Sequence, residues 1–510
     1  MRWLAAESAL ALGVASGLAA LPAAAENWTV TPAIAVRETY TTNANLAPSG
    51  REEWSFITDL TPSIGFNGVG ARARLSGDVA VQLQQYLGER DEGNIYPRVN
   101  LLGSVEAIER FFFVEGAISI SQRYLSPFAP QPQGNIGDTN NRYDSYAYRV
   151  SPYIKGTFAG EGSYLLRNDS IWSSLGNTPS NVPGLSSSFV NRWTGSAESP
   201  ARRTFSLGAE LYSTYTKFTN QEALTSDLVQ GLLHWRPDPQ VHLYAIGGYE
   251  QNNYTVTESS DITYGGGGEW RPTERTEVAG RYEHRFFGDS YLASVTHRNP
   301  FSAINLNASR NISTYPQQLF GLPAGGDVAA LVDAAFTTRI PDPVERAQAV
   351  QTFLNQSGLP AVLQSPLNYY TQQILLIQQA NATFTLLGVR NSLAFTVYNR
   401  KTEPIAGASG LVLPPEFAVQ NNNTQTGGSI AFNHRLTPLT SLTATATRYY
   451  TEAIAPLTAR STTNYFLVSV GTQLSPKTTG VTGLTYTVFD SNLTNDYDAF
   501  TAYVGLNHRF

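Results

Sequence analysis

The sequence predicts an all-β protein, a transmembrane antiparallel β-barrel of about 22 strands, within a range of roughly 18–22. Three observations predict it. Only 15% of the 510 residues are charged, below the ~25% of ordinary globular domains. Beyond the leader, no stretch approaches the ~18 apolar residues of a membrane helix. Instead, apolar and polar residues alternate along segments of about 10–15 residues, long enough to cross a bilayer as strands.

A secretory signal peptide is expected at residues 1–25. An early arginine, the apolar stretch from Ser8 to Leu21 and the small residues Ala23-Ala24-Ala25 form its three parts. The apolar stretch is too short for a membrane anchor and is followed by a proline. The mature chain, residues 26–510, is therefore expected to be one barrel exported to the outer membrane of a bacterium.

The faces of the expected strands differ in character. In the first strand Trp28 and Val30 share one face, and Thr29 and Arg37 share the other. A soluble sheet would alternate in the same way. Long segments, joined by short turns and long polar loops in alternation, favour a barrel with lipid outside and water inside. The last segment ends in Phe510, similar to the carboxy-terminal signal that the bacterial barrel-assembly machinery reads.

Alternation also assigns charged residues to the lumen. The residues projected inward are Arg37, Arg72, Arg74, Asp78, Glu115, Arg123, Arg149, Arg275, Glu277, Arg281, Glu283, Arg285 and Arg435. One interpretation is that they brace a wide barrel through internal ion pairs. The other is that they bind sugars together with interleaved tyrosines, because guanidinium groups bind hydroxyls and carboxylates and aromatic rings stack on pyranose faces.

Residues 315–371 break the alternation. Asp327 can cap a helix with an apolar stripe from Val328 to Phe336, and Asp342-Pro343 can begin a second helix that ends near Gln356. Strand parity places this insertion on the outer side of the barrel. It is a lid above the pore, a constriction folded into the pore, or a solvated surface loop with no gating role. The apolar stripe needs a surface to pack against and favours the first two.

No catalytic, cofactor or metal site is expected. The chain has no cysteine, and none of its six histidines has the spacing of a metal site. Glu283 and His284 are adjacent on a strand and point to opposite faces. The run Gly265–Gly268 lies in a strand-like segment, without the strand–turn–helix context of a phosphate loop. A net charge of −6 argues against a nucleic-acid partner.

Several segments are similar to one known family. They are 31–47, 59–68, 280–288, 386–398 and, most specifically, 312–350, where proline-punctuated helices interrupt a barrel. On these segments the chain resembles the outer-membrane protein family associated with the PEP-CTERM protein-sorting and exopolysaccharide system of Gram-negative bacteria. Thr42 departs from the pattern, since an acidic residue is expected there.

The resemblance implies a non-enzymatic barrel that serves exopolysaccharide export or PEP-CTERM protein sorting. The polar residues projected inward and the insertion predict a polar-lumen channel gated by residues 315–371. Its expected partners are outer-membrane lipid, the barrel-assembly machinery, exopolysaccharide and the export proteins. The alternative is a plugged structural or surface-anchoring barrel without transport activity.

Overall fold

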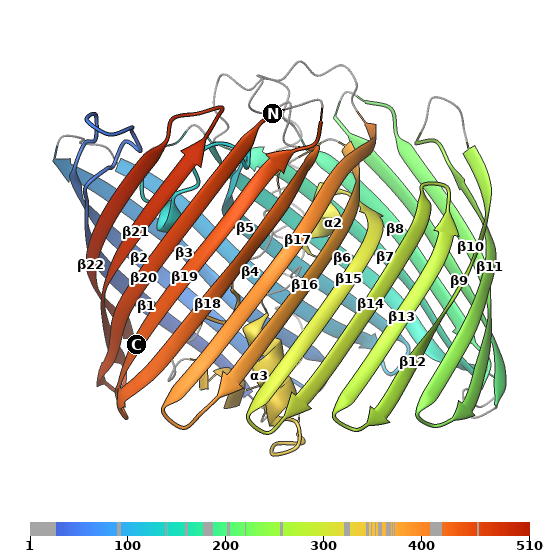
Figure 1. Cartoon of the computed structure of the whole chain (residues 1–510). Coiled ribbons are helices and arrows are strands. Elements are labelled where there is room, and N and C mark those ends of the chain that lie inside the picture. The colour runs from blue at the N-terminus through green and yellow to red at the C-terminus, as the bar shows by residue number, and fades with distance from the viewer. Residues whose placement is uncertain are drawn as a thin grey trace.

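The computed structural model is a closed barrel of 22 antiparallel strands (Figure 1), and it confirms the predicted fold class. The leader at residues 1–25 lies outside the described part of the chain. The structure describes residues 27–510 except 89–92, 138, 140, 159–161, 177–186, 201–203, 220, 255–258, 321–326, 343–345, 348, 352, 355–359, 364–368, 370, 372, 408–420 and 456–457.

Each strand pairs with its neighbours in chain order, and β1 pairs with both β2 and β22, which closes the sheet. The strands are β1 (Asn27–Thr41), β2 (Ser55–Val69), β3 (Ala73–Gly88), β4 (Gly93–Ile108), β5 (Phe112–Tyr124), β6 (Arg142–Phe158), β7 (Gly162–Gly176), β8 (Ser188–Glu198), β9 (Phe205–Phe218), β10 (Leu224–Asp238), β11 (Val241–Asn252), β12 (Ser259–Thr273), β13 (Thr276–Arg285), β14 (Gly288–Asn299), β15 (Ser302–Ser313), β16 (Gln373–Leu387), β17 (Asn391–Gly407), β18 (Asn423–Thr437), β19 (Thr440–Ala453), β20 (Arg460–Ser475), β21 (Thr478–Ser491) and β22 (Tyr497–Arg509).

The period-two alternation separates the two faces of the wall. Directly paired residues on neighbouring strands share a face, so Arg37 and its partner Asp59 both point into the lumen. On the outside, Val30 is 59% and Ile262 68% exposed, as expected of side chains that meet lipid. Closure pairs the backbone around the whole circumference, which matters because an unpaired N–H or C=O in hydrocarbon costs several kcal/mol.

The two ends of the barrel differ in their connections. Short turns such as residues 70–72 and 239–240 lie at the end where β22 finishes, and long connections such as 125–141 and 314–372 lie at the other end. Short periplasmic turns and long outer loops are typical of outer-membrane barrels. The short-turn end, at the bottom of Figure 1, is therefore the periplasmic end.

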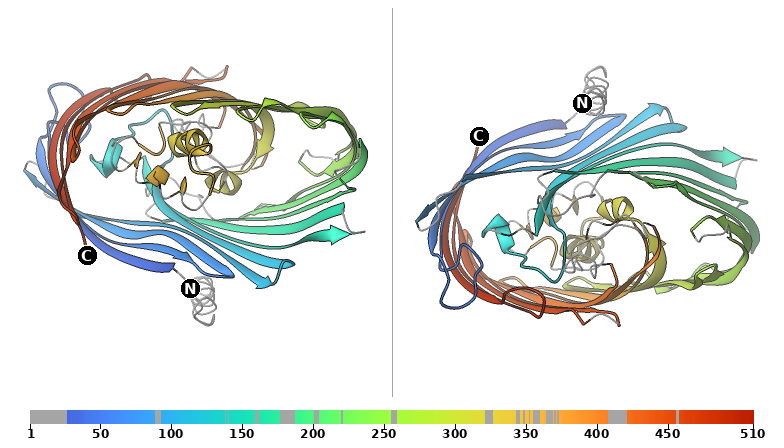
Figure 2. Two further views of the ribbon diagram at one scale, coloured as in Figure 1. Left: turned by 90° about the horizontal axis from the view of Figure 1, so that it is seen from below. Right: turned by 90° about the horizontal axis from the view of Figure 1, so that it is seen from above.

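The outer loop 125–141, which contains the short helix η1 (Gln133–Asn135), folds inward across the lumen. Phe128 is fully buried beside Ala453 and Ala459. The Ser461 hydroxyl on β20 donates to the Pro127 carbonyl at 2.8 Å. This loop, cyan in Figure 2, lies inside the flattened oval of the wall and joins the β5–β6 hairpin to the opposite side.

The insertion after β15 also runs inside the barrel (Figure 2). It begins with α2 (Tyr315–Leu319) and continues with α3 (Val328–Phe336). As the sequence predicts, the Asp327 carboxylate caps α3 by accepting from the Ala330 N–H at 2.8 Å. Between 346 and 354 the described residues are helical. The expected start at 343–345 and the expected end near Gln356 lie outside the described residues.

The described helices are all too short or too polar to cross a membrane.

The helix α3 lies at the periplasmic end of the lumen, although both ends of the insertion are attached at the outer end (Figure 1). The Arg339 guanidinium donates to the carbonyl of Pro300, in the periplasmic turn between β14 and β15, at 3.3 Å. The Arg298 guanidinium donates to the Thr338 hydroxyl at 3.0 Å. The described helices of the insertion therefore lie inside the lumen at both ends of the barrel, α2 at the outer end and α3 at the periplasmic end. It is not a lid above the pore.

An apolar cluster holds α3 against the inner wall. Val328, Leu331, Val332 and Ala335 of α3 are buried against wall residues that include Leu387. At the outer end, the fully buried Tyr315 of α2 shares hydrogen bonds of 2.9 Å with Tyr143 and Ser145 of β6. The apolar stripe of the sequence thus packs on the inside of the barrel, which is how it is removed from water.

Candidate functional site

A cavity of about 520 Å³ lies in the lumen between α2 and the wall from β8 to β15. Its polar lining includes Arg192, Tyr212, Gln230, Arg281 and Arg285. These side chains come from strands β8, β9, β10 and β13, because alternate residues of each strand point inward. The cavity is therefore formed by fixed wall positions together with the first helix of the insertion.

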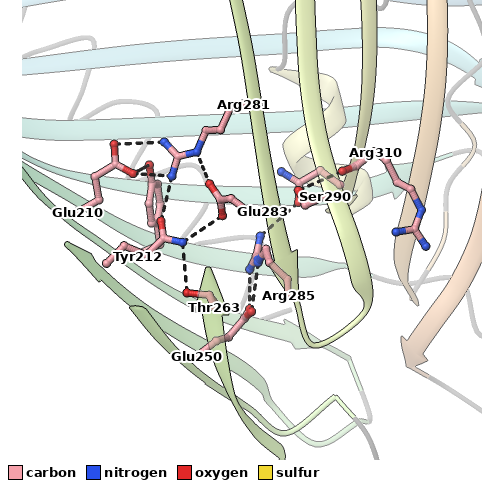
Figure 3. Close-up of polar contacts among 11 residues, drawn as sticks. Glu210, Tyr212, Glu250, Thr263, Arg281, Glu283, Arg285, Ser290 and Arg310 are labelled. Atoms are coloured by element: carbon pink, nitrogen blue, oxygen red, sulfur yellow. Dashed lines mark hydrogen bonds and ion pairs between the residues drawn. The ribbon is translucent and has the colours of Figure 1, made fainter. Parts of the chain in front are cut away.

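Arg281 is the centre of one ion-pair network beside the cavity (Figure 3). Its guanidinium bonds the Glu210 carboxylate, with Nη2 and Oε2 2.8 Å apart, and also bonds the Glu283 carboxylate. The Gln230 side chain accepts from Arg281 at 2.9 Å and donates to Glu283 at 3.0 Å. Tyr212 donates to Glu210 at 3.2 Å. One guanidinium thus lies between two carboxylates, and the neutral Gln230 amide and Tyr212 hydroxyl supply further donors to them.

Arg285 and Glu250 form a second, bidentate pair (Figure 3). The guanidinium donates through Nη2 to Oε1 at 2.5 Å and through Nε to Oε2 at 3.1 Å. The Glu250 side chain is 0% exposed. Fork-to-fork geometry gives strong, directional charge-assisted bonds, so the position of Arg285 at the cavity is fixed.

A third network covers β5 to β8 on the adjoining wall. Arg167 donates to Glu115 at 2.7 Å and to Asp169 at 2.9 Å. Arg192 also donates to Asp169, at 3.2 Å, and the Ser151 hydroxyl donates to Asp169 at 2.6 Å. Asp169 therefore has two guanidinium partners, and one of them, Arg192, reaches the cavity.

Most residues projected into the lumen from the sequence lie on inward faces in the structure. The inward strand positions are Arg37, Arg74, Asp78, Glu115, Arg123, Arg149, Glu277, Arg281, Glu283, Arg285 and Arg435. The structure brings Glu115, Arg281, Glu283 and Arg285 into the networks near the cavity, and the others lie elsewhere along the wall.

Arg72 and Arg275 are not on strands. Arg72 lies in the periplasmic turn before β3 and bonds Glu109 of the next such turn at 3.0 Å. Arg275 lies in the turn between β12 and β13. Each lies one position before the start of a strand, where strand alternation no longer decides the direction of a side chain, so their lumenal position stays a prediction.

Some of the guanidinium groups face aromatic rings of the lumen. The Arg37 guanidinium lies 5.0 Å from the centre of the Tyr503 ring, and that of Arg149 lies 5.2 Å from the Phe320 ring of the insertion. Such cation–π contacts stabilise by about 0.5–2 kcal/mol, depending on desolvation. Arg149 thus contributes to holding the insertion inside the barrel.

The sequence did not point to Glu250, Arg167, Asp169 or Arg192, although all are central to the networks. Arg167 and Asp169 are two residues apart, and carrying the alternation through β7 would have placed both inward. Recognising the ion pair of Glu250 needs the register of the strand pairing, because its partner Arg285 is two strands away, on β13.

Two histidines meet in the lumen near the periplasmic end. The short β10–β11 hairpin brings the His234 Nδ1 and His242 Nε2 atoms within 2.9 Å. Their spacing in the sequence does not predict this contact, because the hairpin turn brings the two side chains together. Within the described residues, no group of three His, Cys, Asp or Glu side chains could hold a metal ion.

The remaining motifs are structural. Glu283 points inward, whereas His284 points outward and stacks on Tyr264 with ring centres 5.2 Å apart. They do not orient one another, as alternation predicts. The glycine run Gly265–Gly268 lies within β12, where a Cβ on Gly267 would come 2.5 Å from the Gly280 carbonyl oxygen. Close backbone approach explains this glycine.

No family model and no curated protein matches the chain. Among solved structures, the siderophore receptor PirA from Acinetobacter baumannii is similar, with 9% identity, a TM-score of 0.44, and coverage of 95% of this chain and 81% of that one. The outer membrane protein opdK from Pseudomonas aeruginosa has 8% identity, a TM-score of 0.34 and coverage of 94% and 99%. A loop-deletion variant of OmpT from Vibrio cholerae has 10% identity, a TM-score of 0.31 and coverage of 95% and 99%.

The architecture itself gives the location. A closed antiparallel barrel with an even number of strands, an apolar outer face and a polar lumen is the form in which β-proteins span the bacterial outer membrane. The protein is an outer-membrane barrel.

Proposed function

We propose that the barrel is a passive channel for polar solutes, with its pathway on the β8–β15 side of the lumen. The observation that supports this is the cavity of about 520 Å³, walled by ion pairs and hydroxyl groups. Such a wall offers hydrogen bonds to a hydrated solute inside the cavity. Residues 315–371 form the constriction beside this pathway.

The solute class and the cellular role rest on the sequence resemblance. We propose that the channel serves exopolysaccharide export in a system of the PEP-CTERM type, that a flexible glycan is the cargo, and that the protein acts without catalysis. The glycan and its export proteins are the proposed partners inside the cell envelope, and the barrel-assembly machinery is the proposed partner during insertion.

A plugged structural barrel is the second candidate, favoured by the inward packing of loop 125–141 and of α3. Conductance across planar bilayers separates the two. The wild-type chain is compared with a variant in which a short Gly/Ser linker replaces residues 315–371. A channel is expected to conduct ions, and the variant is expected to conduct more and to admit larger dextrans.

If wild type and variant are both closed to ions and dextrans, the channel proposal is refuted and the plugged barrel is supported. The cellular role has its own test. A deletion strain that secretes cell-surface polysaccharide at the wild-type level would refute the export proposal.

A further inference from the structure

Three arginines and one acid are the charged side chains that line the cavity in the described residues, although the networks behind them contain further carboxylates. The side chains of Arg192, Arg281 and Arg285 are 41%, 24% and 11% exposed. The carboxylates of Asp169, Glu283 and Glu250, which hold them, are 4%, 8% and 0% exposed, and Glu210, the second acid on Arg281, is 19% exposed. Among the described residues that line the cavity, Glu283 is the one acid. The guanidinium groups therefore stand in front of their carboxylates.

The rest of the lining consists largely of hydroxyl, amide and aromatic groups. Tyr212, Tyr254, Gln230, Ser290 and Asn311 contribute to it. Tyr254 lies in the outer connection after β11, and burial raises its pKa to about 12, so its hydroxyl stays protonated and can donate. Hydroxyls and amides can both donate and accept, which suits the hydroxyls of a sugar, and tyrosine rings offer apolar faces to a pyranose.

We propose that this cavity is a binding subsite for acidic sugars, a short run of uronate units of a polysaccharide, whose carboxylates pair with the guanidinium groups of Arg192, Arg281 and Arg285. This deepens the proposed function and rests on it, because it names the class of solute. Guanidinium forks match a carboxylate in geometry as well as in charge. A neutral sugar would make the same hydroxyl contacts and lose the charge-assisted bonds.

The test is calorimetric titration of the full-length barrel in detergent with tri-galacturonate and with its methyl ester. The ester keeps the shape and hydroxyls and removes the charge. Wild type is expected to bind the acid at least about tenfold more tightly than the ester, since one charge-assisted hydrogen bond is worth about 1.5–3 kcal/mol.

Two variants remove guanidinium groups from the cavity without stranding a buried charge. R285Q/E250Q removes both members of the bidentate pair. R192Q leaves Asp169 bonded to Arg167. Both variants are expected to lose most of the preference for the acid. The control is R271Q, because Arg271 is another arginine paired with acids, at 3.2 Å from Glu269, and does not line the cavity. A difference in SDS-gel mobility between unheated and boiled samples checks that each variant is a folded barrel.

Three outcomes overturn the proposal: equal binding of acid and ester by wild type, a preference that survives in R285Q/E250Q and R192Q, or an R271Q effect as large as theirs. These outcomes are distinct from failure of the channel. A barrel that prefers the acid but conducts no ions keeps the subsite and loses the channel. One that conducts ions without distinguishing acid from ester keeps the channel and loses the subsite.

Discussion

Docking of α3 on the inner wall can be weakened by one substitution, L331A. Leu331 is 4% exposed and belongs to the cluster that holds α3 near the periplasmic end. Truncating a buried leucine to alanine costs about 2–5 kcal/mol. With about 3 kcal/mol, the ratio of docked to undocked helix falls by roughly a hundredfold, because each 1.4 kcal/mol is a factor of ten. The barrel wall itself should stay intact, since its backbone hydrogen bonds are untouched.

A cysteine can report the undocked fraction, because the natural chain has none. Ala335 is 3% exposed on the docked face of α3, so the single thiol of A335C reacts with a maleimide when α3 leaves the wall. The rate is expected to rise by one to two orders of magnitude in L331A/A335C, in line with the population argument. Planar-bilayer conductance of L331A is expected to be larger and noisier than that of wild type.

The matched control is L102A/A335C. Leu102 also points inward, opposite Ser76, but is 49% exposed, so its truncation removes little buried surface. If L331A and L102A label at the same rate, the cluster does not hold the insertion and the reasoning is wrong. A rate already at the unfolded-peptide limit in A335C alone would refute it equally.

Three further predictions concern the insertion, the wall and the chain end. Y315F removes a fully buried hydroxyl that makes hydrogen bonds of 2.9 Å to Tyr143 and Ser145. The loss of these buried bonds should cost about 1–3 kcal/mol and lower the thermal midpoint, whereas an unchanged midpoint would contradict this contact. In G77A the new Cβ would lie 1.9 Å from a carbonyl oxygen of β4 at a φ of +140°, so the heat-resistant barrel should be lost, while G247A, with no atom within 4 Å, should assemble like wild type. Deletion of Phe510 should slow barrel assembly in cells, measured as accumulation of heat-sensitive chain; normal assembly would remove its role as a signal.

The barrel was predictable because the information for it is local. In strands such as β2 and β22 the alternation of apolar and polar residues decides which side chain meets lipid, and no long-range contact is needed to see it. Strand number and the inward position of residues such as Arg281 and Glu283 follow from the same rule. The rule does not apply at turns, where the backbone leaves the pleat, and Arg72 and Arg275 lie in such turns.

The course of the insertion was not predictable in this way. The stripe on α3 shows that it must pack against apolar surface, but the same stripe suits a lid at the outer mouth. The position where α3 docks depends on Leu387 and its neighbours at the periplasmic ends of the wall strands. Only the folded barrel brings these residues together. The pair of Glu250 with Arg285 and the meeting of His234 with His242 likewise depend on register.

The buried position of α3 limits the routes by which the insertion can enter the barrel during assembly. The segment leaves β15 and rejoins β16 at the outer end, yet its helix occupies the opposite end within a closed wall. Polar backbone cannot pass through a wall whose strands are fully paired and surrounded by lipid. Either the segment enters through the unclosed seam before β1 meets β22, or it descends from the outer mouth after closure. In both orders, the last strand pairing and the filling of the interior are separate events in the biogenesis of this protein.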